Sequence, residues 1–368
     1  MASVDYIIIG AGIAGSSAAY ELSKSGTVAI LERESAPGYH TTGRSAAIFE
    51  TTYGYGDPVI RSLVLASEDF FTNPPQDFTD HDLLRPRSEL YIAPRKDYKK
   101  LIAYYEKLKK IVSDVRLVEK EEIKKILPIL NDDYGHTAIL LEGETADIDV
   151  HALHEGYLKG ARSRGAELYT DNEVTAIERK EDLWHITTPQ GEFSAPVIVN
   201  AAGSWVDQVA KLAGVAPIGI KPLRRTMVLI DVPEGYGDID NWPMALELAE
   251  VFYFKPDAGK ILISPCDQTL SEPCDAQPEE IDVAYATHYF HECTGIEIKK
   301  VDHKWAGLRN ALDDGYPAVG FSPDATGFFW LAGQEGIGIM TSPALSRIAA
   351  SMIIGDGIPG DIKAHGID

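Results

Sequence analysis

The chain has few cysteines, no long apolar runs and a deficit of positive charge. Its cysteines, Cys266, Cys274 and Cys293, are few and odd in number for 368 residues, which argues against a disulfide framework and predicts a reducing cytoplasm. No stretch approaches the roughly 18 apolar residues that a membrane-spanning helix needs, so we expect no integral membrane segment. The run Tyr6–Ile9 is short and no Lys or Arg precedes it, so it indicates a first strand rather than a signal peptide.

Acidic residues outnumber basic ones by 56 to 34, which gives a formal net charge of −22. A polyanion repels nucleic-acid backbones and anionic lipid surfaces, so we expect neither as a partner. The same field would concentrate cationic small molecules near the protein. We also expect no metal site: His288, His291 and Cys293 fall in one predicted helix, Glu279–Cys293, and their spacing does not place all three on one face.

Predicted strands and helices alternate near both ends of the chain, whereas its middle is rich in strands. Two helix starts carry cap signals, Asp57 before Pro58 and Ser204 three residues before Asp207. This order favours an α/β plus α+β fold, in which a Rossmann-like nucleotide domain is assembled from three segments and a β-rich substrate domain of mixed sheet and helices is inserted. We predict the nucleotide domain in residues 1–82, 147–200 and 307–368, and the substrate domain in residues 83–146 and 201–306.

A glycine-rich turn follows the first predicted strand directly. In Gly10-Ala11-Gly12-Ile13-Ala14-Gly15, the first two glycines permit a tight turn close to a pyrophosphate, and the third lets the next helix pack on the strand. Glu32 ends the second strand, about 20 residues after Gly10, where an acidic side chain accepts hydrogen bonds from a ribose. The segment Asp5–Glu32 therefore predicts a dinucleotide-binding βαβ unit.

Two further segments favour FAD over NAD, which shares the same fingerprint. The loop Thr42–Ala47 consists mainly of small residues suited to lie against a flat ring, and a second glycine-rich strand-to-helix turn, Gly333–Gly338, comes near the other end of the chain. A helix N-terminus at that turn could stabilise negative charge on a reduced flavin. FAD is long enough to need both segments, whereas an NAD enzyme of the common kind would complete its domain contiguously.

These motifs resemble the FAD-dependent D-amino acid oxidase and dehydrogenase family, which has the DAO fold of the glutathione-reductase-type FAD enzymes. The likeness covers nearly the whole chain and rests on Ile7–Gly15 with Glu32, Thr42–Ala47, Val197–Gly203 and Gly333–Ser342. Within the family, the strings LERESAPGYHTTGRSAA, NPP, DIDVHALHEGYLKG, FYFKPDAG and WAGLR resemble the broad-specificity bacterial D-arginine dehydrogenases. We expect non-covalent FAD, because none of the three cysteines lies in the C-terminal flavin segment.

The resemblance implies a role for individual residues. Arg225, Arg309 and Tyr253 would hold the substrate carboxylate, which suits arginine because its guanidinium is planar and always charged. The Gly336 carbonyl would accept from the α-amine. Tyr53 and Glu89 would face the substrate side chain. The residues expected to bind FAD are Gly10, Gly12, Ile13, Ala14, Gly15, Glu32, Arg33, Thr42, Gly43, Arg44, Ser45, Ala46, Ala47, Val174, Ala202, Gly203, Gly333, Gly336, Ile337, Gly338 and Ile339.

Three positions depart from the D-arginine dehydrogenase pattern. Ile48 replaces a histidine and Met340 replaces a glutamine, which would slow the enzyme or favour more apolar substrate side chains. Glu50 replaces an uncharged residue. If Glu50 and Glu89 both face the pocket, basic substrates gain a second countercharge; if they do not, medium-sized apolar D-amino acids are favoured.

The expected activity is FAD-dependent oxidative deamination of D-amino acids, basic or hydrophobic, by hydride transfer from Cα to flavin N5. The imino acid product would hydrolyse to a 2-oxo acid and ammonia. We leave the electron acceptor open between a quinone and another molecule, and we expect a monomer or weak dimer. The alternative within the same fold is an O₂-using oxidase of glycine, sarcosine or another secondary amine. The alternative from another class is a non-catalytic flavin-binding protein.

Overall fold

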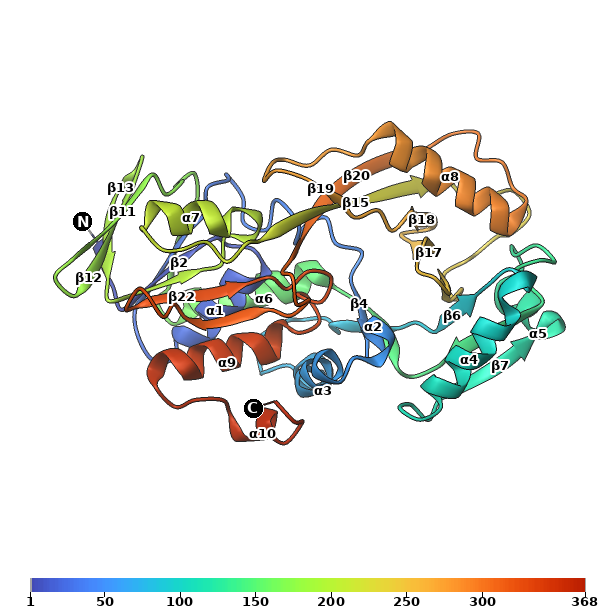
Figure 1. Ribbon diagram of the computed structural model, residues 1–368, viewed down its shortest axis with the longest axis horizontal. Helices are drawn as coiled ribbons and strands as arrows, with labels where there is room; N and C mark the ends of the chain where they lie inside the picture. Colours follow the sequence, from blue (N-terminus) through green and yellow to red (C-terminus); the bar gives the residue numbers. More distant parts are fainter. Residues whose placement is uncertain (1, 368) are drawn as a thin grey trace.

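The computed structural model describes residues 2–367. A six-stranded sheet, in the order β10-β3-β2-β14-β22-β21, lies at one end of the long axis (Figure 1). All neighbouring strands in it are parallel except β21 and β22. Its members are β2 (Tyr6–Ile9), β3 (Val28–Leu31), β10 (Glu167–Tyr169), β14 (Val197–Asn200), β21 (Ala318–Phe321) and β22 (Phe328–Ala332), which come from three distant parts of the chain.

Both faces of this sheet are covered, because its central strands β2, β3, β14 and β22 are almost wholly apolar and alternate residues point to opposite sides. Ile8 packs with helices on one face, whereas Ile7 and Ile9 pack on the other. The first face carries α1 (Ile13–Leu22), α6 (Val150–Ser163) and α9 (Ser342–Ile354). The second face carries α7 (Val206–Leu212) and a four-stranded sheet of β1 (Ala2–Ser3), β11 (Ala176–Lys180), β12 (Leu183–Thr188) and β13 (Gly191–Ala195).

A nine-stranded mixed sheet forms the other end of the molecule (Figure 1). One face packs on α5 (Lys120–Ile126) and α8 (Glu280–Thr294), and the other packs on α4 (Tyr98–Leu108), which follows the short η1 (Arg95–Asp97). The strands are β6 (Glu89–Ile92), β7 (Val115–Glu119), β8 (Thr137–Leu141), β15 (Lys221–Ile230), β16 (Met244–Glu247), β17 (Tyr253–Asp257), β18 (Lys260–Ser264), β19 (Thr269–Leu270) and β20 (His303–Ala311).

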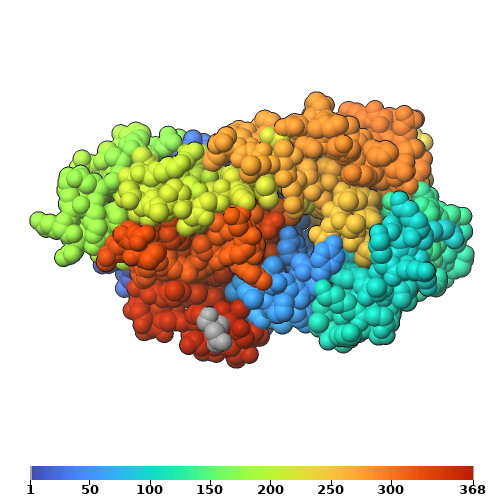
Figure 2. All heavy atoms as spheres, in the orientation of Figure 1, coloured from blue at the N-terminus to red at the C-terminus, as the bar shows by residue number. Residues whose placement is uncertain are grey.

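A small antiparallel sheet and a helical segment lie between these two bodies. The sheet joins β4 (Ile48–Glu50), β5 (Leu84–Pro86) and β9 (Thr145–Ile148). The helical segment comprises α2 (Tyr53–Gly56) and α3 (Pro58–Thr72), and α10 (Gly360–Lys363) closes the chain beside α3. In Figure 2 the light-blue segment that contains α3 fills the space between the red C-terminal helices and the cyan segment of α4.

The predicted fold class is confirmed, and one of the two predicted caps is wrong. Asp57 caps α3 as expected, because its carboxylate accepts from the N–H groups of Val59 and Ile60. Ser204 instead lies inside the short η2 (Gly203–Trp205), and α7 begins only after it. Its hydroxyl donates to Asn310 Oδ1 at 2.6 Å, so a partner on β20 displaces the local cap.

The predicted domain boundaries cut through β9, between residues 146 and 147, and through β20, between residues 306 and 307, and the boundary after residue 200 separates α7 from the sheet on which it packs. α7, which follows residue 200, packs in the core of the six-stranded sheet, and β20 continues past residue 306 to Ala311 while paired with β15. We therefore propose that the nucleotide domain includes α7 and that β20 belongs wholly to the substrate domain. Within residues 2–367, no helix combines the length and apolar composition needed to cross a bilayer.

Candidate active site

One long cavity of about 540 Å³ runs between the six-stranded and nine-stranded sheets. Its lining begins at Glu32, where β3 ends, passes the Gly10–Ala14 turn, and reaches Arg225, Tyr253 and Arg309 on the large sheet. The cavity thus lies at the carboxyl ends of β2, β3 and β14, the edge at which open α/β sheets bind their ligands. We call the part lined by Tyr53, Arg225, Tyr253 and Arg309 the substrate end.

The Glu32 end has a preorganised acidic group. Glu32 is 7% exposed, and its two carboxylate oxygens accept from the N–H groups of Ala11 and Glu34, at 2.8 and 2.9 Å. Each oxygen has a second lone pair, which remains available to a ribose hydroxyl. Arg33 stacks over the Trp205 ring at 4.8 Å, and Val174 lines the opposite wall, as predicted.

The glycine turn leaves room for a phosphate at the start of α1. Gly10 has φ +99°, and a Cβ there would meet the Ala201 carbonyl oxygen at 2.6 Å, so only glycine fits. The N–H of Ile13 donates to Thr42 Oγ1 at 2.9 Å. The N–H groups of Ala14 and Gly15 lie in the first helical turn, where no intrahelical acceptor exists, and α1 therefore presents donors and its positive dipole end to an anion.

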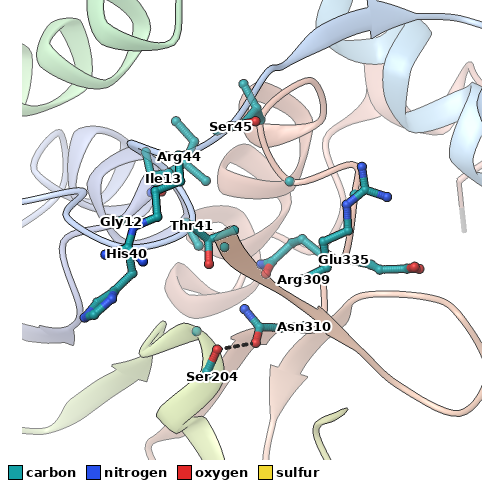
Figure 3. A pocket seen from close by; sticks show the side chains of 18 of the residues that line it. Gly12, Ile13, His40, Thr41, Arg44, Ser45, Ser204, Arg309, Asn310 and Glu335 are labelled. Atoms are coloured by element: carbon teal, nitrogen blue, oxygen red, sulfur yellow. Dashed lines mark hydrogen bonds between the residues drawn. The ribbon is translucent and has the colours of Figure 1, made fainter. Parts of the chain in front are cut away.

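The loop Thr42–Ala47 lies along the cavity, but its arginine has a partner in the substrate domain. Arg44 donates to the carbonyl oxygens of Ala276 and Ala306, each at 3.0 Å, and pairs with Asp275. Its role is therefore to tie the loop to the large sheet, whereas the small residues Ser45, Ala46 and Ala47 line the cavity. Thr41, which directly precedes the loop, donates to the Leu308 carbonyl at 2.7 Å and lies beside Arg309 and Asn310 in Figure 3.

The substrate end brings together four side chains predicted to contact substrate. Arg309 Nη1 donates to the Tyr53 hydroxyl at 3.3 Å. Arg225 is 6% exposed, and its Nε donates to the Asp267 carbonyl, which leaves both terminal nitrogens free for an anion. Tyr253 directs its hydroxyl toward Met227 Sδ at 3.4 Å, and burial raises its pKa to about 12, so the phenol stays protonated.

Gly336 packs directly against this group. A Cβ at Gly336 would lie 2.2 Å from the Tyr53 hydroxyl and 2.9 Å from Arg309 Nη1, so a side chain would fill the space beside them. The adjacent Glu335 adopts a left-handed φ of 43° and lines the cavity as well. The second glycine-rich turn therefore brings the backbone of Gly336 and the carboxylate of Glu335 to the substrate end.

Three carboxylates line the substrate half of the cavity: Glu50, Glu250 and Glu335. Burial raises the pKa of Glu50 to about 7, although Thr52 and Tyr91 donate hydrogen bonds to it. Burial also raises the pKa of Glu250, against the opposing effects of the Tyr55 hydrogen bond and the charges of Arg225 and Arg309. The cavity thus offers two fixed cations, Arg225 and Arg309, and two acids, Glu50 and Glu250, whose pKa values are raised.

Six of the predicted site residues lie outside the cavity lining. Met340 and Ile337, each 2% exposed, pack in a hydrophobic cluster behind the cavity. Gly15 is needed for packing, because its Cβ would meet the Gly10 carbonyl oxygen at 1.9 Å. Glu89 is 1% exposed and lies on β6 beyond the Tyr91 side chain, which lines the cavity in its place. The others are Gly43, whose N–H donates to Gly38, and Gly333.

The remaining predicted residues line the cavity, together with some that the sequence did not single out. Glu250, Glu335, Tyr55 and Tyr91 belong to the second group. Glu335 belongs to the predicted glycine turn Gly333–Gly338, so the sequence predicted its location but not its role. Glu250 and Tyr55 carried no signal, because each reaches the cavity from a loop with left-handed backbone.

The residues along the cavity fit a dinucleotide that carries a flavin. An acidic group, an open helix N-terminus with its glycines and a loop of small residues follow one another along a single wall, as the ribose, the pyrophosphate and a flat ring require. The C-terminal turn then faces the same cavity from the opposite end of the chain. These residues line a longer stretch of the cavity than a mononucleotide would occupy.

Comparisons with known proteins agree with this fit. The family model for DAO, FAD-dependent oxidoreductases, matches residues 5–352. Glycine oxidase of Bacillus licheniformis is 24% identical over 96% of this chain and 94% of its own length. Mitochondrial dimethylglycine dehydrogenase of Rattus norvegicus is 29% identical over 40% of this chain and 17% of its own length. The solved structure of L-α-glycerophosphate oxidase from Mycoplasma pneumoniae with FAD bound has a TM-score of 0.84 at 19% identity, covering 96% of this chain and 95% of that one. The protein therefore belongs to the DAO family of FAD-dependent oxidoreductases, and its cofactor is FAD.

Proposed function

We propose that this protein oxidises D-amino acids to imino acids, which hydrolyse in water to 2-oxo acids and ammonia. The observation that carries the proposal is the pair Arg225 and Arg309 at one end of the FAD cavity, with Tyr53 and Tyr253 beside them. Arg225 is buried and Arg309 half-buried, and within residues 2–367 neither forms a carboxylate salt bridge, which suits a ligand that brings its own carboxylate. The D configuration rests on the motif resemblance to the D-arginine dehydrogenases.

FAD supplies the acceptor for a hydride that leaves the substrate Cα. The chain itself holds and orients the substrate: Arg225 and Arg309 bind the carboxylate, and the Gly336 backbone accepts from the α-amine. Holding both groups fixes the position of Cα, which is the main contribution that the protein needs to make. The α-ammonium must lose a proton before the hydride leaves, because only a neutral amine can form the imine. The rate should therefore rise with pH.

A second candidate is the oxidation of glycine or an N-substituted glycine. The curated relatives named glycine oxidase and dimethylglycine dehydrogenase favour it. Both reactions use the same carboxylate clamp, but glycine and its N-methyl derivatives need no room beyond Cα. The acidic wall at Glu50 and the apolar residues Ile48, Met244 and Leu246 enlarge the cavity on that side, which favours substrates with a side chain.

The two candidates are separated by anaerobic mixing of the yellow protein with substrate. Flavin absorbance near 450 nm should bleach with D-arginine, D-lysine, D-methionine or D-leucine and stay unchanged with their L-forms. Bleaching by glycine, sarcosine or dimethylglycine alone would establish the second candidate instead. Bleaching by none of these compounds would favour a flavin-binding protein without this turnover. Oxygen consumption in the same assay distinguishes an oxidase from a dehydrogenase that needs a quinone or another acceptor.

Arg309→Met and Arg225→Met should each lower kcat/KM for D-amino acids by on the order of 100-fold, because each removes a charge that pairs with the substrate carboxylate. The matched control is Arg224→Met. Arg224 is the neighbour of Arg225 on β15, points to the opposite side of the strand and pairs with Glu279. Steady-state kinetics on FAD-loaded protein provide the measurement. Equal losses in all three variants would contradict the assignment of the clamp.

A further inference from the structure

Glu50 is the carboxylate that meets the cavity on the side-chain side of the substrate end. It lies at the end of β4, is 7% exposed and lines the cavity. Its Oε1 accepts from the Thr52 hydroxyl at 3.0 Å and from the Tyr91 hydroxyl at 3.1 Å. Among residues 2–367, no donor reaches Oε2. One oxygen is thus anchored and the other is available to a ligand.

Glu89 lies behind this contact and faces the same way. It precedes Tyr91 by two positions on β6, so both side chains project from one face of the strand. Glu89 is 1% exposed, and neither of its carboxylate oxygens has a hydrogen-bond partner within residues 2–367. A buried carboxylate without donors is very costly, whereas the protonated acid is not. We therefore expect Glu89 to stay protonated.

The groups that face these two acids are acidic or neutral. Glu250 faces both from the loop between β16 and β17, Tyr91 faces both from β6, and Tyr104 faces Tyr91 from α4. Within the described chain, no Lys, Arg or His forms an ion pair with Glu50 or Glu89. Burial raises the pKa of Glu89 well above its ordinary value, and the nearby charges of Glu50 and Glu250 raise it further.

We propose that Glu50 and Glu89 act as a pair that keeps one proton on Glu89, and that ionised Glu50 binds the cationic end of a basic D-amino acid side chain. This deepens the proposed function and rests on it, since the clamp at Arg225 and Arg309 must hold the other end of the substrate. The residue that pairs with a cationic substrate side chain is then Glu50, which lines the cavity, and not Glu89, which the resemblance implied.

A consequence is that preference for a charged side chain depends on pH. Below pH 7 Glu50 is protonated and carries no charge, because burial raises its pKa to about 7. Above pH 7 Glu50 is an anion with no cation of its own, and a guanidinium or ammonium that binds there gains a charge-assisted hydrogen bond. Neutral side chains gain nothing from this ionisation.

The test compares D-arginine with D-citrulline, which has nearly the same shape but no side-chain charge. The quantity is the ratio of their second-order rate constants for anaerobic flavin reduction by FAD-loaded protein, measured from pH 5.5 to pH 9. The ratio cancels the ionisation that both α-amines share. In the wild-type protein it should rise by about tenfold or more through pH 7.

Three variants complete the test. Glu50→Gln should lower the ratio at pH 9 by on the order of 10-fold and abolish its pH dependence. Glu89→Gln should keep both the high ratio at pH 9 and the pH at which the ratio rises, because glutamine replaces a carboxyl group that is already neutral. Glu247→Gln is the control, because Glu247 is equally buried but lies outside the cavity lining. The wild-type profile can be read even if a variant fails to fold.

A flat wild-type ratio, or a ratio that collapses in Glu89→Gln and survives in Glu50→Gln, would overturn this inference. Those outcomes leave the proposed function intact as long as D-citrulline, D-methionine or D-leucine still bleaches the flavin. If no D-amino acid, basic or neutral, bleaches the flavin of the wild-type protein, the proposed function itself fails.

Discussion

At the scale of single residues, four non-glycine residues around the substrate end have a left-handed backbone. They are Tyr55 (φ 58°), Glu250 (φ 55°), Cys266 (φ 50°) and Glu335 (φ 43°), and all four line the cavity. Such backbone costs of order 1–3 kcal/mol per residue and persists only where surrounding contacts hold it. Tyr55, for example, directs its hydroxyl to the Leu248 carbonyl at 3.4 Å. The strain places acidic and aromatic side chains where regular strands could not.

The raised pKa of Glu50 predicts how stability changes with pH. The folded protein binds this proton more tightly than the unfolded chain, so the associated stability is fully present below pH 4.5 and is lost as pH rises through about 7. The loss is on the order of 3 kcal/mol. Glu50→Gln has no such proton, and its melting temperature should overtake that of the wild type between pH 5 and pH 8. Parallel melting curves at every pH would contradict the prediction.

The substrate clamp could be predicted residue by residue, but the side-chain pocket could not. Arg225, Arg309 and Tyr53 all line the cavity, at the positions that the family resemblance implied for them. Glu89 and Met340 were expected at the pocket and lie behind it. Which of two acids on neighbouring strands reaches the cavity depends on how β4 and β6 are offset in space, and no local pattern encodes that offset.

At the scale of elements, the unit of β2, the glycine turn and α1 sets how closely the cofactor approaches the sheet. Gly15→Ala places a Cβ 1.9 Å from the Gly10 carbonyl oxygen, so α1 must move away from β2. We expect FAD affinity to fall at least tenfold and stability to fall by about 1–3 kcal/mol.

Titration of the apoprotein with FAD, followed by flavin fluorescence, measures the affinity of this variant. The control is Gly191→Ala, since a Cβ at Gly191 meets nothing within 4 Å and its φ is not left-handed. If Gly15→Ala binds FAD as tightly as Gly191→Ala does, the close approach of α1 has no role in cofactor binding.

Strands and helices with strong local signals were predicted closely, whereas weak or context-dependent ones were not. β2 coincides with the predicted first strand, Tyr6–Ile9, and α3 begins at its predicted cap. Ser204 has the residue type of a cap but bonds across to Asn310. β4 has only three residues, and its pairing with β9 brings together positions almost 100 residues apart, as Ile48 and Asp147 do. Contacts with distant parts of the chain determine whether such short elements form, and the local sequence does not show which parts those are.

At the scale of the whole molecule, a buried ionic group connects the small sheet to the nine-stranded one. Asp147 of β9 accepts from Lys255 Nζ at 2.7 Å and pairs with Arg87. The side chains of Arg87 and Lys255 are each only 5% exposed. Asp147 is thus the sole carboxylate, within residues 2–367, that neutralises two buried cations.

Asp147→Asn should lower the free energy of unfolding by about 3–5 kcal/mol, because it leaves two buried cations uncompensated. Asp313→Asn is the comparison: Asp313 pairs with Lys221 at the surface, where such a pair contributes at most about 1 kcal/mol. Urea unfolding followed by tryptophan fluorescence measures both. A loss in Asp147→Asn no larger than in Asp313→Asn would show that β9 is held in place by packing alone.

The three-part origin of the six-stranded sheet constrains how the protein is made. β2 leaves the ribosome among the first residues, but β22, which completes its side of the sheet beyond β14, ends at Ala332. At roughly 5–20 residues per second, synthesis of the intervening chain takes on the order of 15–60 seconds. During that time the nascent glycine turn has no C-terminal counterpart, and β14 has an open edge. Cofactor binding to both glycine turns therefore requires that β22 and the turn after it have been made, and until then the exposed strand edges of the growing chain need to be shielded.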